Sequence, residues 1–231
     1  MNYRAILTLA SLTLASCMRH PDASGHLIRT SLIASCLASI MGLDVVDQEY
    51  IRLATPVHDL GKLAIPDHVL LKPGKLDPEE RRIMERHSGI GAELLTGSLH
   101  ELHQYASVIA RHHHEHFDGS GYPDCLAGQS IPLPARVVAV ADAFDAMTEA
   151  RCYRASMTEM AAKAIISAGS GTHFDPAAVH AFLEGFSSIM RARRAANEIL
   201  SLGSEAAVVA QFYGLTRRDF PGLRDQWRTT S

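Results

Sequence analysis

Two short segments of this chain bring together residue types that bind divalent metal ions. Residues 112–118, with the sequence HHHEHFD, hold four histidines and two carboxylates, and a Gly-Ser-Gly-Tyr-Pro turn follows at 119–123. Earlier in the chain, His58 and Asp59 are adjacent within the segment TPVHDLGK. Imidazole nitrogens bind such ions, and a carboxylate can bridge two of them. The two segments together therefore predict a site for a cluster of divalent metals.

A carboxylate also stands within the apolar segment VVAVADAF at 137–144. Burying Asp142 in such a helix is costly unless the carboxylate is paired or coordinates a metal. Asp145 lies three residues further on, on roughly the same helical face. We expect Asp145 to be structural, in contact with a ligand or a helix end.

The composition favours a helical protein. The 231 residues fit one large domain, or one domain and a tail. Hydrophobic residues make up 47% but aromatic residues only 6%, whereas strands favour β-branched and aromatic side chains. The formal charge of −3 leaves no broad basic surface for polymeric nucleic acid. The four cysteines show no C-x-x-C spacing, so a thiolate zinc site is not expected, and scattered free cysteines suit a reducing cytosol.

Helical periodicity runs along most of the chain. The segment Asp77-Pro78-Glu79-Glu80 predicts a helix start, with Asp as the N-cap and Glu three residues later. Glycine and proline predict loops at 66–76 and 117–134. Helices are expected over residues 26–42, 48–60, 77 to about 91, 99–115, 134–151 and 176–184.

The two ends of the chain need separate interpretation. Met1–Cys17 is similar to a lipoprotein signal with its acceptor cysteine, but it also fits an amphipathic first helix. It is too short to span a membrane. We expect the helix, still attached to the chain, because the segment leads without a break into the residues around Asp22 and His26. Residues 186–231 are expected to form a helical and irregular tail.

Eight motifs, in order along the chain, resemble those of the HD-GYP hydrolases. They are HDLGK (58–62), IPD (65–67), KPGKL (72–76), HHE (113–115), DGSGYP (118–123), IPLPAR (131–136), VADAFDAMT (140–148) and HFDP (173–176). The resemblance runs from about Leu9 to Leu183. It implies an all-α, HD-type helical bundle with an ordered Gly-Tyr-Pro loop, formed by residues 1–185 and followed by the tail at 186–231.

The same resemblance implies an activity. Family members are phosphodiesterases that open cyclic di-GMP to the linear dinucleotide, and often continue to GMP. Two or three divalent ions, with iron or manganese favoured, would bind the scissile phosphate and activate a water molecule. We therefore expect a cytoplasmic enzyme without stable membrane insertion, and leave open a homodimer or a signalling protein partner.

The resemblance also assigns metal-binding roles to individual residues. The implied ligands are His26, His58, Asp59, His87, His113, His114 and Asp142. Asp59 would bridge two ions and so take part in catalysis. Asp22 stands where members with three metals have Glu, so a third ion depends on the reach of the shorter side chain. Glu115 is expected to orient a ligand, whereas His112 and His116 are expected to flank the site without binding.

Other positions would act on the substrate. Lys62 would neutralise charge on the phosphorane or protonate the leaving 3′-oxygen, and it faces the site if the preceding helix continues past His58. Tyr122 would hydrogen-bond to the substrate or stack on it. Arg151 and Arg154 match positions that bind phosphate or guanine, and Arg is suited to bidentate phosphate contacts.

One position departs from the family pattern. Cys125 stands where the family has Gly, so a positive φ at this position would strain the loop by ~1 kcal/mol or more.

Two alternatives to this function remain open. One is an HD-type hydrolase of another cyclic dinucleotide or of a nucleotide. The other is a weakly active module that senses cyclic di-GMP, which a degenerate set of ligands would favour.

Overall fold

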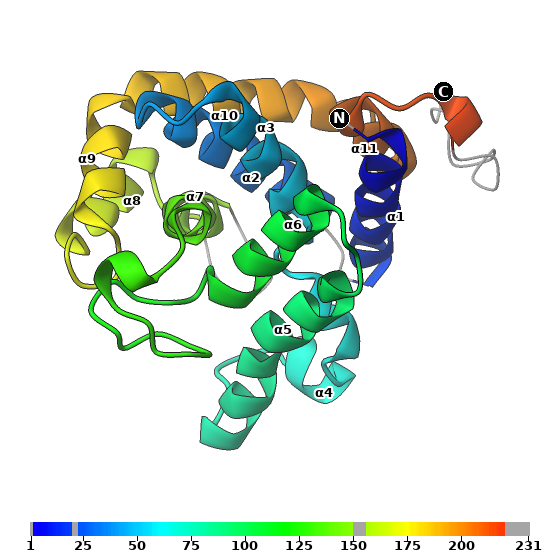
Figure 1. The fold of residues 1–231 in the computed structure, drawn as a ribbon. Coiled ribbons are helices and arrows are strands. Elements are labelled where there is room, and N and C mark those ends of the chain that lie inside the picture. Colours follow the sequence, from blue (N-terminus) through cyan, green and yellow to red (C-terminus); the bar gives the residue numbers. More distant parts are fainter. Residues whose placement is uncertain (1, 20–22, 150–155, 220–231) are drawn as a thin grey trace.

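The computed structural model describes residues 2–19, 23–149 and 156–219, which form a bundle of helices (Figure 1). These ranges contain no strand, which confirms the predicted all-α class. In chain order the elements are α1 (Tyr3–Arg19), α2 (Ala23–Ile40), α3 (Val45–Ala54), η1 (Thr55–Val57), η2 (Leu60–Ala64), α4 (Asp67–Leu70), α5 (Pro78–Thr96), α6 (Glu101–His112), η3 (Gly128–Ser130), α7 (Leu133–Thr148), α8 (Glu159–Ala168), α9 (Pro176–Glu184), α10 (Phe186–Leu200), α11 (Glu205–Tyr213) and η4 (Arg217–Asp219).

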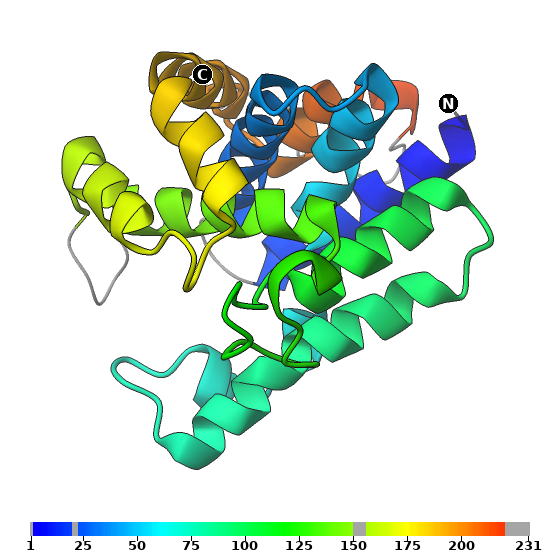
Figure 2. The same ribbon diagram turned by 60° about the vertical axis from the view of Figure 1, so that its left-hand side comes forward.

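Helix α2 is central to the bundle, where it contacts α3, α7 and α10 (Figure 1). Helix α5 packs against α6 and η2, and the first part of α5 extends away from the other helices together with α4 (Figure 2). The core is largely aliphatic, in line with the 6% aromatic content of the chain, with Phe144 and Phe182 among its few buried rings. Burial of these apolar surfaces is the main force that holds the helices together.

Local sequence signals fix several helix ends. Asp77 accepts hydrogen bonds from the backbone N–H groups of Glu79 and Glu80, and the Glu80 carboxylate accepts one from the N–H of Asp77. This is the capping box predicted from the sequence. Helix α9 covers Pro176–Glu184, the range expected, with Asp175 as its N-cap.

The helix expected over residues 48–60 is wrong at its carboxyl end, because α3 stops at Ala54. Pro56 has no N–H to donate to the carbonyl of Arg52, and the Ser31 hydroxyl donates to that carbonyl instead, at 2.5 Å. The chain continues through two 3₁₀ turns, with His58 between them. Lys62 is therefore not on a helix that continues from His58, and its position depends on η2.

Gly61 allows η2 to approach α5 closely. A Cβ atom at this position would lie 1.9 Å from the carbonyl oxygen of His87 and 2.6 Å from the backbone nitrogen of Gly91. Because these are backbone atoms of a helix, they cannot move aside as a flexible side chain would. The glycine of the HDLGK motif therefore brings the His58–Asp59 turn against the helix that carries His87.

The amino-terminal segment forms the helix that the sequence analysis favoured. Leu9, Leu14 and Cys17 of α1 are buried, and α1 packs against α11 and the 3₁₀ turns. Among the described helices, none has the length and apolar character needed to cross a bilayer.

The described part of the expected tail shares the core of the bundle. Helix α10 packs along α2, and α11 packs against α1 (Figure 1). Ile189 and Ala196 of α10 and Val209 of α11 are fully buried. The packed unit therefore continues beyond the predicted domain boundary at residue 185.

Candidate metal centre

Three buried histidines present unpaired ring nitrogens to the surroundings of Asp59. The Nδ1 atoms of His58 and His87 lie 2.8 Å from the Thr55 carbonyl oxygen and 2.7 Å from the Met84 carbonyl oxygen, respectively. The Nδ1 atom of His113 lies 3.0 Å from the carbonyl oxygen of Ala110. A carbonyl only accepts hydrogen bonds, so these contacts place the ring proton on Nδ1 and leave the Nε2 lone pair free.

The Nε2 atoms of these three histidines are buried and have no hydrogen-bond partner. Buried polar atoms are rarely left without a partner. Because the donor set around them consists of imidazole nitrogens and carboxylate oxygens, it fits one or more divalent transition metals. The residues present therefore fit the metal cluster that the sequence predicted.

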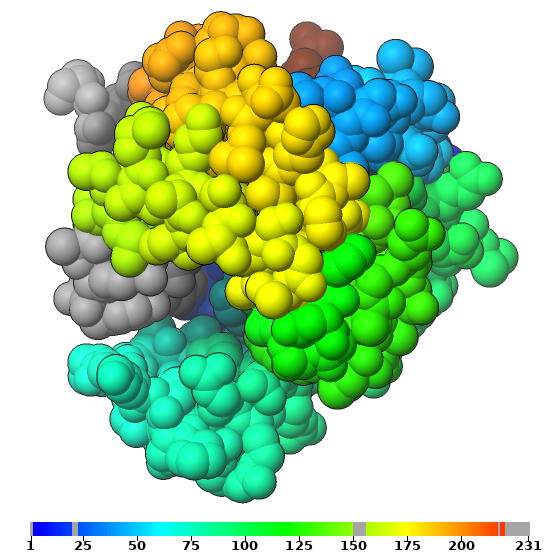
Figure 3. Space-filling view, turned by 90° about the vertical axis from the view of Figure 1, so that its left-hand side faces the viewer, coloured from blue at the N-terminus to red at the C-terminus, as the bar shows by residue number. Residues whose placement is uncertain are grey.

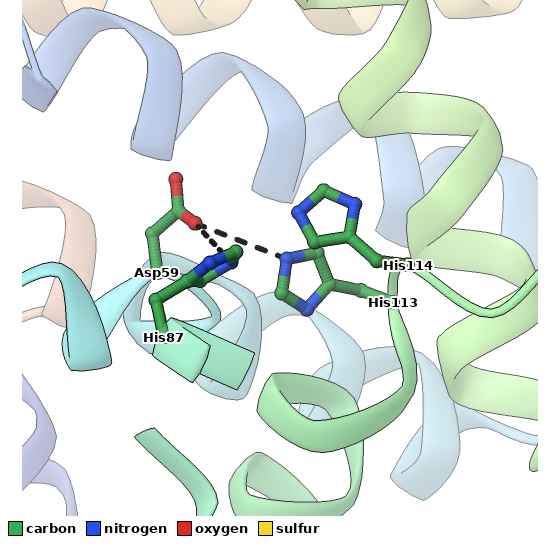
Figure 4. Close-up of side chains that lie close together, drawn as sticks. All are labelled: Asp59, His87, His113 and His114. Carbon is green, nitrogen blue, oxygen red and sulfur yellow. Dashed lines mark ion pairs between the residues drawn. The ribbon is translucent and has the colours of Figure 1, made fainter. Parts of the chain in front are cut away.

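The first group of potential ligands consists of Asp59, His87, His113 and His114, whose donor atoms lie within 4.8 Å of one another. The same Asp59 oxygen, Oδ1, lies 3.3 Å from His87 Nε2 and 3.8 Å from His113 Nε2 (Figure 4). These side chains come from the turn before η2, from α5 and from the end of α6. They meet although positions 59 and 113 are 54 apart in the sequence.

The second group consists of His26, His58 and Asp59. His58 Nε2 lies 3.5 Å from Asp59 Oδ2, the oxygen that faces away from the first group. Asp142 of α7 borders this group, with Oδ1 at 3.0 Å from His26 Nε2 and 3.8 Å from His58 Nε2. Asp59 thus belongs to both groups and offers one oxygen to each, which is the arrangement needed for a carboxylate that bridges two ions.

The charges at the first group favour neutral imidazoles and an ionised carboxylate. Burial lowers the pKa of His113 well below its usual range and lowers that of His114 to about 3. Burial acts to raise the pKa of Asp59, but Lys62 and the neighbouring histidines outweigh it and hold that pKa well below its ordinary value. At the second group, burial acts to lower the pKa of His26, but the carboxylates of Asp142 and Asp145 outweigh it and raise that pKa to about 9. Metal ligands must be neutral imidazoles and ionised carboxylates, so an ion that binds His26 must displace a proton from its ring.

Lys62 lies beside the Asp59 oxygen that faces the second group, and Tyr122 lies beside the first group. The Lys62 ammonium lies 2.5 Å from Asp59 Oδ2, so it reaches the site even though the expected continuous helix is absent. The ring of Tyr122 lies against that of His114, with centroids 4.9 Å apart. Burial raises the pKa of the Tyr122 phenol, which keeps it protonated as a hydrogen-bond donor.

Glu115 holds the Gly-Tyr-Pro loop. Its carboxylate, fully buried, accepts hydrogen bonds from the backbone N–H groups of Asp124 at 2.7 Å and Leu126 at 3.0 Å. The expectation that Glu115 orients a metal ligand is therefore wrong, because both of its oxygens are directed to the loop. The sequence analysis did not consider that the Glu115 carboxylate could accept hydrogen bonds from backbone N–H groups nine and eleven residues later.

The same loop contains the departure from the family pattern. Cys125 has φ = 52°, a conformation that glycine adopts more easily. This is the positive φ at which the sequence analysis expected strain in the loop. Gly121 lies so close to the preceding turn that a Cβ atom would be 2.2 Å from the backbone nitrogen of His116. The loop therefore folds back tightly on the segment that carries His113 and His114.

Not every candidate residue joins the two groups. His112 lies near Glu115 and Asp124, but Arg111 pairs with Asp124 through two 2.7 Å hydrogen bonds. The ring of His116 lies against that of His173, with a centroid distance of 3.9 Å and a tilt of 36°. Asp22, Arg151 and Arg154 lie outside the described residues, so their predicted roles remain predictions.

The surface of the molecule is hollowed on one face. In Figure 3 a hollow separates the cyan part of the chain, which includes η2 and α4, from the green and yellow parts.

Comparisons with known proteins agree with this geometry. Residues 12–178 match the family described as HD domain. The chain is 49% identical over 178 residues to the cyclic di-GMP phosphodiesterase response regulator RpfG of Xanthomonas campestris pv. campestris, a match that covers 77% of this chain and 47% of that protein. It is 41% identical over 175 residues to 3′3′-cGAMP-specific phosphodiesterase 2 of Vibrio cholerae, with coverage of 76% and 34%.

The solved structure of Bd1817, a HDG"Y"P protein from Bdellovibrio bacteriovorus, shares the fold. The two structures superimpose with a TM-score of 0.57 at 20% sequence identity, and the match covers 75% of this chain and 56% of the Bd1817 chain. This likeness supports the predicted helical bundle. The chain spans half or less of the length of the two curated relatives.

Proposed function

Since the chain belongs to the HD domain family, as its HD-GYP motifs predicted, we propose that it is a metal-dependent phosphodiesterase that hydrolyses cyclic di-GMP. The observation that carries this proposal is the position of Asp59, whose two oxygens face two different groups of histidines. A bridging carboxylate between two ions is a recurring arrangement in enzymes that cleave phosphodiesters. Relatives of this chain named as cyclic di-GMP phosphodiesterases give the substrate class.

The proposed cofactor is a pair of divalent ions held by His26, His58, Asp59 and Asp142 on one side and by Asp59, His87, His113 and His114 on the other. When bound, the ions would stabilise charge on the phosphate and lower the pKa of a bound water. Iron or manganese fits the nitrogen and oxygen donors. A third ion is proposed only if Asp22 reaches the centre.

The protein's own residues supply the remaining functions. Lys62, one-third exposed, is the cation beside the bridging carboxylate. It would donate a proton to the leaving 3′-oxygen or stabilise the negative charge that develops there. Tyr122 would contact the substrate as a neutral donor, with the loop around it fixed by Glu115. Arg151 and Arg154 are proposed to bind the second half of the cyclic dinucleotide, in the cytoplasm where cyclic di-GMP is made.

A specific observation supports a second substrate. Relatives with similar identity to this chain carry two different substrate names, cyclic di-GMP and 3′3′-cGAMP. The metal ligands of this chain would not separate these substrates, because both contain the same kind of phosphodiester. Discrimination between guanine and adenine must come from contacts to the bases.

Turnover measured on three substrates tests the proposal. Purified protein reconstituted with Mn²⁺ or Fe²⁺ is incubated with cyclic di-GMP, 3′3′-cGAMP or bis(p-nitrophenyl) phosphate, with and without a chelator. We expect the highest kcat/KM on cyclic di-GMP and loss of turnover with the chelator. Faster cleavage of 3′3′-cGAMP would favour the second substrate. Tight binding of cyclic di-GMP without turnover would instead favour the sensing module.

A further inference from the structure

His26 is oriented differently from the buried histidines described above. The Nδ1 atoms of His58, His87 and His113 face backbone carbonyls, whereas the Nδ1 atom of His26 lies 2.8 Å from the carboxylate oxygen Oδ2 of Asp145. A backbone carbonyl within a helix stays in place whatever side chains surround it. The orientation of His26 instead depends on side chains, chiefly Asp145 of a different helix, with a longer contact of 3.4 Å from the Thr30 hydroxyl of its own helix.

Asp145 is itself fixed by an arginine. Its side chain is fully buried, and Arg29 donates to it through Nε at 2.6 Å and Nη2 at 3.3 Å. Arg29 and His26 lie three residues apart on α2, so both face the same part of α7. The Nη2 atom of Arg29 also lies 3.3 Å from Glu149, at the end of α7. Arg29 thus compensates the negative charge of Asp145, whose burial without a partner would be costly.

From this difference we propose that Asp145 and Arg29 are positioning residues that control metal binding at one of the two positions. They hold His26 so that its Nε2 faces Asp142 and His58, where it lies 3.0 Å from Asp142 Oδ1. The metal position of His26, His58, Asp59 and Asp142 depends on this pair. The position of Asp59, His87, His113 and His114 does not.

The contacts within the first group explain its independence. His87 and His113 are oriented by carbonyls of α5 and α6, and the side-chain hydrogen bonds of Asp145 go to His26 and Arg29. A carboxylate that accepts a hydrogen bond from a metal-binding histidine fixes the ring and increases its basicity, and its loss lowers metal affinity by about 10- to 100-fold. The two ions should therefore respond differently to one substitution.

The variant Asp145→Asn tests the inference, which rests on the proposed two-ion centre. Mn²⁺ alone is titrated into metal-free protein and binding is followed by calorimetry and by the electron paramagnetic resonance signal of free Mn²⁺. In the unsubstituted protein we expect two bound ions. In Asp145→Asn we expect affinity at one position to fall by about 10- to 100-fold while the other stays unchanged.

Asp175→Asn is the matched control. Asp175 is also a buried carboxylate paired with an arginine, Arg136, but it caps α9 and contacts no histidine of the centre. The Asp175→Asn variant should bind both Mn²⁺ ions with unchanged affinity. Arg29→Lys keeps the positive charge but loses the planar fork, so it should weaken the same single position, and it decides the question if Asp145→Asn does not fold.

The outcomes separate this inference from the proposed function. Two unchanged affinities in Asp145→Asn, or an equal loss at both positions, would show that the inference is wrong while the two-ion centre stands. The same loss in Asp175→Asn would attribute the effect to general destabilisation and also overturn it. Fewer than two ions in the unsubstituted protein would overturn the centre itself, and this inference with it.

Discussion

Oδ1 of Asp59 lies 3.3 Å from Nε2 of His87, although one residue belongs to a turn and the other to a helix that begins nearly twenty residues later. The two meet because η2 packs directly against α5 at Gly61. The chemistry of the site therefore depends on a backbone contact, and this dependence leads to predictions for both the ligands and the glycine.

Asp59→Ala should abolish hydrolysis while the helical content is retained. Asp59 offers one oxygen to each group of histidines, so its loss removes the only residue that belongs to both groups among the described residues. Turnover of cyclic di-GMP and far-ultraviolet circular dichroism check the two halves of this prediction. Asp67→Ala, which removes an exposed partner of Arg19, is the control and should keep normal turnover. Near-normal activity of Asp59→Ala would show that the bridging role is wrong.

Gly61→Ala should destabilise the protein and weaken metal binding together. The added Cβ would overlap the carbonyl of His87, so η2 must move away from α5 and Asp59 must move away from His87. Overpacking of this kind costs about 1–3 kcal/mol. Denaturant unfolding measures the loss of stability, and Mn²⁺ titration measures the loss of binding.

Gly97→Ala is the matched control for that substitution. Gly97 follows the last residue of α5 with φ = −66°, and a Cβ there meets nothing within 4 Å. The free energy of unfolding of Gly97→Ala should differ from that of the unsubstituted protein by no more than about 0.5 kcal/mol. If both alanine variants behave alike, close packing at Gly61 does not position the site.

Lys62→Gln should lower kcat on cyclic di-GMP by about 10²- to 10⁴-fold, the usual contribution of a proton donor, while both ions stay bound. The p-nitrophenolate leaving group of bis(p-nitrophenyl) phosphate needs no proton, so hydrolysis of that substrate should change little. Lys75→Gln, on the exposed loop before α5, is the control. Equal losses on both substrates would mean that Lys62 stabilises charge and does not act as an acid.

Arg151→Ala should weaken the use of the dinucleotide far more than metal binding. Loss of a charge-assisted contact costs about 1.5–3 kcal/mol, which corresponds to a roughly 10- to 150-fold lower kcat/KM. Bis(p-nitrophenyl) phosphate lacks the second half of the dinucleotide, so its hydrolysis should hardly change. If Arg151→Ala slows both substrates equally, Arg151 supports the fold or the metals instead of the substrate.

Part of the candidate metal site could be predicted from residue types that are chemically unusual in their surroundings, whereas His26 and His87 were expected only from the resemblance to the HD-GYP motifs. Tandem histidines and a carboxylate in an apolar helix point to metals wherever the helices lie, and the structure brings His26, His58, Asp59, His87, His113, His114 and Asp142 together. The starts of α5 and α9 were also predictable, because the N-cap residues Asp77 and Asp175 and the prolines that follow them are adjacent in the sequence.

Features that depend on distant contacts were not predictable in this way. The end of α3 depends on the hydroxyl of Ser31, and the role of Glu115 depends on backbone donors of the following loop. The packing of α10 on α2 is likewise a tertiary contact, which a basic, alanine-rich sequence does not reveal. The pairing of Asp145 with His26 required both helices to be in place.

The ratio of metal to protein tests the central claim most directly. Metal-free protein is reconstituted with an excess of Mn²⁺ or Fe²⁺ under reducing conditions, freed of unbound metal, and analysed for both metal and protein. Two groups of ligands that share Asp59 predict at least two ions per chain. One ion per chain, or none, would contradict the shared carboxylate and the mechanism built on it.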